Sequence, residues 1–217
     1  MSLLPPDLAG ILPAHRITAL AEGGALKLAA PFAQGQVQPA SLDLRLGVRA
    51  WRMRASFLPG PGRPVSACIA NLALHEIDLE RGAVLETGCV YVAELQESLA
   101  LPSSVAAAAN PKSSTGRIDV FTRVITDRAR EFDMIEQGYN GPLYAEISPR
   151  TFPVLVRAGS RLSQVRFRQG HARLDGQLQV DAGAGPHGIH QRIGHAQVAH
   201  LFAFALHEHR SCRVEVA

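Results

Sequence analysis

The chain has 217 residues, 47% hydrophobic and 19% charged, a balance typical of a folded protein that excludes global disorder. A net charge of +3 gives no basis for a dedicated nucleic-acid-binding protein. The absence of any run of 18 apolar residues argues against a membrane-spanning helix, and three dispersed cysteines argue against a disulfide framework. We therefore expect a soluble, cytoplasmic protein.

Short segments in which polar and apolar residues alternate predict strands at residues 41–46, 89–94, 118–126, 143–148, 154–156 and 163–167. Turn-forming glycines, prolines and asparagines separate them at residues 58–62, 81–82, 138–141 and 158–160. Helical periodicity is weak, apart from a short turn around residues 7–12 and a helix start near Ser113. Many short strands at near-even spacing favour a sandwich, a jelly roll or a barrel over a parallel α/β sheet. Of these we predict an all-β distorted β-barrel or jelly roll with few short helices.

The composition changes after about residue 170. Seven of the nine histidines lie in residues 171–217, among glycine, alanine, glutamine and arginine. Imidazole is a common metal ligand, but the spacings match no standard zinc pattern. The alternatives are a poorly structured extension and a segment translated out of its original frame. We expect residues 1–170 to form the functional domain.

A polar cluster at residues 112–117 suits an anion. Ser113 and Ser114 are predicted to cap a short helix, and Lys112 and Arg117 flank them with positive charge. An arginine offers two parallel N–H donors to a phosphate. The alternative is an ordinary capped turn on a solvated loop.

The alternation of residues 143–148 places Tyr144, Glu146 and Ser148 on one face of a strand. From alternation alone, Glu146 is a surface carboxylate. Asp43 and Arg45, in the strand at residues 41–46, are interpreted as members of structural salt bridges. Pattern and spacing alone therefore predict no more than a β domain with a candidate anion-binding loop.

In their order and spacing, these segments resemble the dCTP deaminases of the trimeric dUTPase superfamily. Residues 40–47, Ala-Ser-Leu-Asp-Leu-Arg-Leu-Gly, are similar to a family strand, and residues 112–117 are similar to a family Arg-Ser-Ser-x-Ala-Arg motif. The Gly-Tyr-Asn-Gly turn at residues 138–141 precedes Glu146 as in the family, and residues 90–102 resemble a strand that runs into a Leu-Pro turn. The likeness covers residues 38–168.

Residues 138–150 look closest to the long, two-domain subgroup of these deaminases, in which this domain is the N-terminal half. The resemblance therefore implies that a second half is missing from this chain. It also implies a homotrimer whose active sites lie between subunits. The expected partners are dCTP and dUTP, without a membrane or a nucleic acid.

The resemblance implies hydrolytic deamination of dCTP to dUTP and ammonia. Glu146 is then the general base and acid, Ser113 holds the attacking water, and Arg117 orients Glu146. No His-x-Glu or Pro-Cys-x-x-Cys motif of the zinc deaminases occurs, so we expect no zinc and no protein-bound metal. Magnesium is expected only with the triphosphate.

The resemblance also implies a set of substrate-binding residues. Backbone groups along residues 124–126 and around Tyr144 and Ala145 are expected to read the base, and Glu136 is the candidate for the sugar. The full predicted set is Lys112, Ser113, Ser114, Thr115, Gly116, Arg117, Thr126, Glu136, Tyr144 and Ala145.

Three departures from the family keep alternatives open. Lys112 replaces an arginine, residues 128–137 are longer than their counterpart, and nothing after Arg168 matches the family segment that closes over the triphosphate. The rival functions are a dUTP pyrophosphatase, a bifunctional deaminase-pyrophosphatase and an inactive nucleotide-binding module. The pyrophosphatase is disfavoured because Glu136-Gln137 stands where its aspartate is expected.

Overall fold

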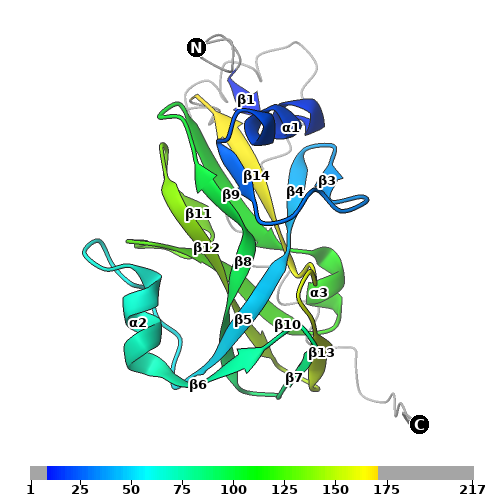
Figure 1. Cartoon of the computed structure of the whole chain (residues 1–217), viewed down its shortest axis with the longest axis vertical. Coiled ribbons are helices and arrows are strands. Elements are labelled where there is room, and N and C mark those ends of the chain that lie inside the picture. Colours follow the sequence, from blue (N-terminus) through cyan, green and yellow to red (C-terminus); the bar gives the residue numbers. More distant parts are fainter. Residues whose placement is uncertain (1–8, 171–217) are drawn as a thin grey trace, which may run out of the picture. The chain divides into compact units, whose positions relative to one another are not determined.

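Over residues 9–170 the architecture is built from antiparallel strands, with three short helices at their margins (Figure 1). The structure is a computed structural model and describes residues 9–170. The histidine-rich segment at residues 171–217 lies outside the described residues. The prediction of an all-β fold with few short helices is confirmed.

Two six-stranded sheets and a two-stranded sheet make up the described part. The first runs in the order β11-β9-β14-β4-β3, with β1 also paired to β14, and its strands are β1 (Gly10–Ile11), β3 (Val37–Gln38), β4 (Ser41–Leu44), β9 (Val105–Pro111), β11 (Met134–Ile135) and β14 (Ser163–Gln169). The second runs β10-β12-β8-β5-β6, with β2 also paired to β8, and its strands are β2 (Leu26–Leu28), β5 (Leu46–Met53), β6 (Ala73–Asp78), β8 (Val90–Ala100), β10 (Val120–Thr126) and β12 (Asn140–Pro149). The third joins β7 (Ala83–Leu85) to β13 (Val154–Val156).

Three buried apolar clusters hold these layers together. One joins the first sheet to one end of the second, and Phe167 and Leu143 are fully buried in it. Another lies between the second sheet and the pair β7-β13, around Tyr91 and Ile147. The third covers the opposite face of the second sheet, where Tyr144 contributes to it. Since β12 belongs to all three, both of its faces are buried.

Most predicted strands recur with shifted ends, and residues 154–156 recur without change as β13, but residues 41–46 are divided between β4 and β5, which belong to different sheets. One expectation about them is wrong. Residues 41–46 were expected to be buried on one face, but all four residues of β4 are buried because the polar side chains Ser41 and Asp43 have partners inside the protein. Gly138 and Gly159 have φ values of 71° and 86°, which glycine adopts readily, so the turns predicted there are confirmed.

The helices were poorly predicted. A helical turn around residues 7–12 is contradicted by β1 (Gly10–Ile11), which pairs with β14. The structure adds α1 (Ala14–Glu22) and α2 (Val65–Leu72), whereas the helix start near Ser113 is confirmed by α3 (Ser113–Arg117). Helix α1 buries only Ile17 and Leu20, and this apolar signal is too sparse to predict a helix.

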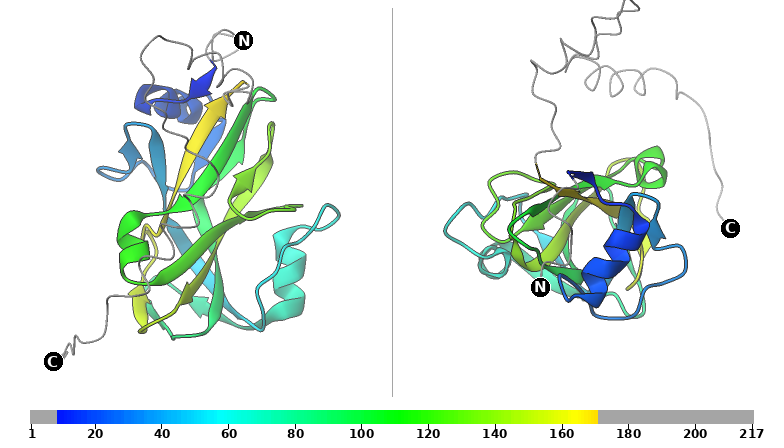
Figure 2. Two further views of the ribbon diagram at one scale, coloured as in Figure 1. Left: turned by 180° about the vertical axis from the view of Figure 1, so that it is seen from behind. Right: turned by 90° about the horizontal axis from the view of Figure 1, so that it is seen from above.

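Helices α2 and α3 lie on opposite flanks of the sheet that contains β12 (Figures 1 and 2). Val65 and Ile69 of α2 pack on the face of the second sheet that carries Tyr144. Helix α3 precedes β10 and contacts it at the other flank. This arrangement separates the segments that the sequence analysis assigned to one site.

Candidate active site

Glu146 is a buried carboxylate in the central strand of the second sheet. It lies opposite Arg123 of β10 and Val92 of β8 in the strand register. Because side chains alternate along a strand, Glu146 points to the same face as Tyr144, which is the face that α2 covers. Glu146 is only 1% exposed, so the expectation of a surface carboxylate from alternation alone is wrong.

One oxygen of this carboxylate is tied to an arginine. The Nε and Nη2 atoms of Arg123 both lie 2.8 Å from Oε1 of Glu146. The other oxygen, Oε2, is buried and has no hydrogen-bond partner. A buried acceptor without a donor is costly, so Oε2 is suited to receive a hydrogen bond from a water or a ligand.

A second carboxylate, Asp133, lies beside this pair. Its Oδ1 accepts a hydrogen bond of 2.7 Å from the backbone N–H of Val124. Burial raises the pKa of Asp133 to about 6, and the negative charge of Glu146 adds to the rise. The hydrogen bond from Val124 and the positive charge of Arg123 lower the pKa, but their effect is smaller. Asp133 has a φ of 63° and holds the segment after β10 against that strand.

The predicted anion cluster forms α3. Ser113, Ser114, Gly116 and Arg117 are exposed, whereas Thr115 is buried and its hydroxyl donates a hydrogen bond of 2.9 Å to the carbonyl of Leu162. The N-cap of α3 is Lys112, with no side-chain cap bond, so the prediction that the serines cap this helix is wrong. Both serines are exposed and therefore accessible to a ligand.

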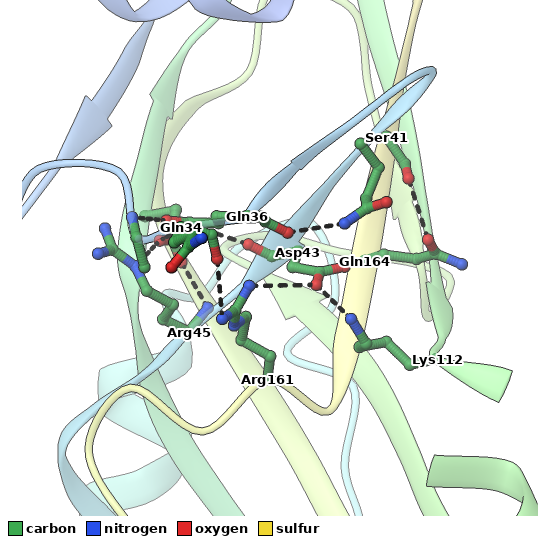
Figure 3. A network of polar contacts seen from close by, with 12 residues as sticks. Gln34, Gln36, Ser41, Asp43, Arg45, Lys112, Arg161 and Gln164 are labelled. Carbon is green, nitrogen blue, oxygen red and sulfur yellow. Dashed lines mark hydrogen bonds and ion pairs between the residues drawn. The ribbon is translucent and has the colours of Figure 1, made fainter. Parts of the chain in front are cut away.

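Lys112 is engaged inside the protein. Its ammonium pairs with Oδ2 of Asp43, whose side chain is 2% exposed, and Nη1 of Arg161 lies 3.7 Å from the same oxygen (Figure 3). The Oδ1 atom of Asp43 is buried and has no partner. A cavity of about 380 Å³ opens between β4, the start of α3 and β14, and Asp43, Lys112, Ser113 and Arg166 contribute to its lining.

The same network confirms the structural role expected of Arg45 and Asp43, although the two are not paired with each other. Arg45 donates from Nε to Oε1 of the fully buried Glu97 over 2.7 Å. Gln36 links the two parts, because its amide nitrogen donates to Glu97 and to the backbone carbonyl of Asp43 (Figure 3). The motif at residues 40–47 therefore contributes Arg45 to the Glu97 side of this buried polar network and Asp43 to the Lys112 side.

Two of the predicted nucleoside contacts lie at a separate cavity. Thr126 and Glu136 contribute to a cavity of about 710 Å³, together with Asp127, Gly138 and Tyr139. Glu136 is exposed and its carboxylate is accessible to a ligand there. These two residues are thus brought together, but apart from Lys112 and Ser113.

The Gly-Tyr-Asn-Gly turn shapes this second cavity. The hydroxyl of Tyr139 donates to the carbonyl of Pro142 over 2.7 Å and accepts from the backbone N–H of Asp127 over 3.1 Å. A Cβ at Gly141 would lie 2.7 Å from that hydroxyl, which explains a glycine at this position. Burial raises the pKa of Tyr139 well above its ordinary value.

Tyr144 and Ala145, expected to read the base, lie in the interior of the second sheet. Ala145 is fully buried and Tyr144 is 6% exposed. Burial and the nearby negative charges of Asp127 and Glu94 raise the pKa of Tyr144 to about 12. The strand that carries both residues pairs with β10 on one side and with β8 on the other. This pairing does not test a role in base recognition, which therefore stays a prediction.

Within the described chain, the predicted site residues therefore fall into three groups: α3 with Lys112, the cavity with Thr126 and Glu136, and the buried Glu146. Sequence reasoning missed Arg123, which is paired with Glu146, Ser56, which accepts a hydrogen bond from Arg123, and Asp133, whose carboxylate interacts with both charges. Arg123 shares a strand face with Phe121, but no sequence signal gave the register that places it opposite Glu146. Arg117, expected to orient Glu146, is exposed on α3 in this chain.

Among residues 9–170, no cluster of three or more histidine, cysteine, aspartate or glutamate side chains forms a metal site. In the same part of the chain, no helix has the length and hydropathy that crossing a membrane requires.

Residues 8–171 match the family model of the 2'-deoxycytidine 5'-triphosphate deaminase N-terminal domain. A crystal structure of 2'-deoxycytidine 5'-triphosphate deaminase from Agrobacterium tumefaciens is 61% identical, with a TM-score of 0.76 over 80% of this chain and 53% of that chain. This chain therefore spans about half the length of that protein.

Curated relatives are more distant. A protein of Beutenbergia cavernae named dCTP deaminase, dUMP-forming, is 29% identical over 138 residues, which are 63% of this chain and 68% of the relative. A protein of Haloarcula marismortui named dCTP deaminase is 28% identical over 137 residues, 62% of this chain and 67% of the relative.

Proposed function

This chain belongs to the dCTP deaminase family, and we propose that it catalyses the hydrolytic deamination of dCTP to dUTP and ammonia. The observation that carries the proposal is the state of Glu146: a buried carboxylate with one oxygen held by Arg123 and the other without a partner. A carboxylate of this kind can take a proton from water in a site that excludes bulk solvent.

In the proposed reaction, Glu146 removes a proton from a water molecule as the water oxygen adds to C4 of the cytosine ring. The same carboxyl group then delivers that proton to the ring nitrogen N3. The remaining proton of the former water, now on the C4 hydroxyl, is then transferred to the exocyclic amine, so that ammonia leaves and the C4 carbonyl of uracil forms. The balance is dCTP and water to dUTP and ammonia, and it requires no oxidant or zinc ion.

The triphosphate is proposed to lie against α3. The exposed hydroxyls of Ser113 and Ser114 and the guanidinium of Arg117 are accessible to an anion, and Lys112 lines the adjoining cavity. Glu136 and Thr126 are proposed to contact the nucleoside at the larger cavity. Magnesium enters as part of the Mg–nucleotide substrate, because the phosphate oxygens supply the hard ligands that it prefers.

We propose a homotrimer in which neighbouring chains complete each site, acting in the cytoplasm. The support is the separation of α3 and α2 on opposite flanks of the second sheet (Figure 2). Glu146 shares the α2 face with Tyr144, because side chains alternate along β12. A nucleotide that contacts both Ser113 and Glu146 would then take these two residues from different chains of the trimer. This arrangement also gives Arg117 of one chain access to Glu146 of another.

A second candidate is deamination coupled to hydrolysis of the phosphate chain, with dUMP as the product. The observation that favours it is that several curated relatives are named dUMP-forming. The exposed carboxylate of Glu136 beside the larger cavity is the group that would act there on a phosphate-directed water.

Incubating the purified chain with Mg–dCTP, and in parallel with Mg–dUTP, and separating the nucleotides by ion-exchange chromatography tests the proposal. We expect equimolar dUTP and ammonia. Formation of dUMP and pyrophosphate with ammonia would instead support the second candidate, and turnover of dUTP without ammonia from dCTP would support a pyrophosphatase. Unchanged dCTP together with unchanged dUTP would contradict an enzymatic role for this chain.

The intersubunit site is tested by co-expressing two inactive variants, Glu146→Gln and Arg117→Ala. If the two residues act together across a subunit boundary, some sites in mixed trimers combine both native residues and activity returns. If both residues belong to one chain's site, co-expression leaves activity as low as in the separate variants. Sedimentation equilibrium of the native chain reports the trimer itself.

A further inference from the structure

The contact between Arg123 and Glu146 is unusual for an arginine and a carboxylate. Such pairs commonly form two parallel hydrogen bonds, one to each oxygen. Arg123 instead directs both Nε and Nη2 to Oε1, at 2.8 Å each. Oε2 is left buried without a partner, so the two oxygens of one carboxylate are in different states.

The guanidinium of Arg123 is fixed from three directions. Its Nη2 atom donates a hydrogen bond of 2.8 Å to the hydroxyl of Ser56, in the segment between β5 and α2. Its central carbon lies 3.5 Å from the ring centroid of Phe132 and 4.9 Å from that of Phe121. A cation stacked on an aromatic face and tied at a second nitrogen has little freedom to turn.

We propose that Arg123 is a positioning residue for the deamination, which holds Oε1 of Glu146 so that Oε2 alone exchanges the proton with water. The inference rests on the proposed function and adds a residue and an atom to it. Ser56 and Phe132 keep the guanidinium in place and act on the reaction only through it. Arg123 itself touches neither water nor nucleotide.

This role is separate from the one that the family resemblance gives to Arg117, which is proposed to reach Glu146 from a neighbouring chain. Arg117 is exposed on α3, whereas the side chain of Arg123 is only 25% exposed and is already in contact with the carboxylate. A partly buried ion pair of this geometry keeps its orientation before substrate arrives, which is what preorganised general-base catalysis needs.

The first test measures kcat and KM for Arg123→Gln. Glutamine removes the positive charge and the paired N–H donors of the guanidinium. We therefore expect kcat to fall about 100-fold while KM for dCTP stays within about threefold, as for a misplaced catalytic group. Ser56→Ala and Phe132→Leu keep the ion pair and loosen it, and we expect smaller losses in kcat, about threefold and tenfold, also without a change in KM. These two variants decide the matter if Arg123→Gln does not fold.

The decisive comparison uses the Glu146→Gln background. If Arg123 acts only through Glu146, adding Arg123→Gln to Glu146→Gln produces no further loss of kcat. A further loss of tenfold or more would show that Arg123 contacts the substrate or water directly and would overturn the inference. A parental kcat in Ser56→Ala and Phe132→Leu would overturn it as well.

Arg49→Gln is the matched control. Arg49 also lies on the second sheet, pairs with a carboxylate, Glu94, at 2.6 Å, and has its guanidinium 5.4 Å from the ring centroid of Trp51. We expect its kcat and KM to equal those of the parent. A loss equal to that of Arg123→Gln would indicate that any such arginine matters and would contradict a specific positioning role.

A readout independent of turnover separates this inference from the proposed function. In protein labelled with 13C at the glutamate carboxyl carbon, the Glu146 resonance is identified by its absence in Glu146→Gln. We expect it to shift in Arg123→Gln and to stay in Arg49→Gln. If the native chain fails to deaminate dCTP while the resonance shifts, the proposed function fails and the contact stands; if the chain is active and the resonance does not shift, the inference fails.

Discussion

Lys112 and Asp43 are joined by an ion pair although they are 69 residues apart, so the motif at residues 40–47 and the start of α3 form one unit. The carboxylate of Asp43 is 2% exposed and the Lys112 side chain is 27% exposed. A buried carboxylate without a cation is strongly unfavourable, so Lys112 has a structural task beside its proposed contact with phosphate.

Lys112→Ala is therefore expected to raise the KM for dCTP and to lower the free energy of unfolding by about 1–2 kcal/mol. The loss is moderate because Arg161 remains 3.7 Å from Asp43. Steady-state kinetics and urea unfolding measure the two effects. Arg161→Ala is the control, with a smaller loss of stability and a native KM; an unchanged KM in Lys112→Ala would exclude the phosphate contact.

Asp133→Asn is expected to alter the pH dependence of stability. Burial raises the pKa of Asp133 from 3.8 to about 6, so the folded protein holds a proton between pH 4 and 6 that the unfolded chain has released. The favourable contribution is complete below pH 4 and is lost as the pH rises through 6, by about 1–2 kcal/mol for this partly exposed group.

Asparagine suits this position because it tolerates the φ of 63° and can accept the hydrogen bond from Val124. Urea unfolding of both proteins at pH 4, 5, 6 and 7 measures the difference. We expect Asp133→Asn to gain stability relative to the parent as the pH rises. A constant difference between the two proteins would contradict the raised pKa.

Gly116→Ala is expected to stabilise the protein by about 0.5–1 kcal/mol, because alanine is the better helix former. A Cβ at this position would meet no atom within 4 Å, and Gly116 lies within α3. Thermal unfolding measures the gain. A lower Tm in this variant would show that the glycine is needed for the conformation of α3.

Gly141→Ala is expected to destabilise the protein by about 1–3 kcal/mol, because the new methyl group displaces the Tyr139 hydroxyl from its two hydrogen bonds. Gly62→Ala is the matched control, since a Cβ at Gly62 would meet nothing within 4 Å. Equal unfolding free energies for the two variants would contradict the proposed reason for a glycine at position 141.

The sequence predicted those parts of the structure in which a local pattern decides. Alternation located most of the long strands, and the turn glycines located their ends, because strand pleating and positive φ leave direct marks on the sequence. Helix α2 buries Val65, Cys68 and Ile69 at helical spacing, but a pattern only eight residues long is too short to predict a helix. Family resemblance located Glu146 but not its surroundings.

The environment of Glu146 depends on contacts that no local pattern records. Its burial results from α2 and the segments around Ser56 and Phe132, which pack on a strand far away in the sequence. Its pairing with Arg123 depends on the register across an irregular connection that includes Asp133. The family resemblance predicted a role for Glu146, whereas tertiary packing decides which oxygen of its carboxylate remains available.

The most direct measurement is the rate of ammonia release from dCTP by the native chain and by Glu146→Gln, with nucleotide binding measured in parallel. Glutamine keeps the shape of the side chain and removes the base, so we expect turnover to fall by about 10²–10⁴-fold while dCTP still binds. Deamination by Glu146→Gln at the parental rate would contradict the assignment of this carboxylate as the general base.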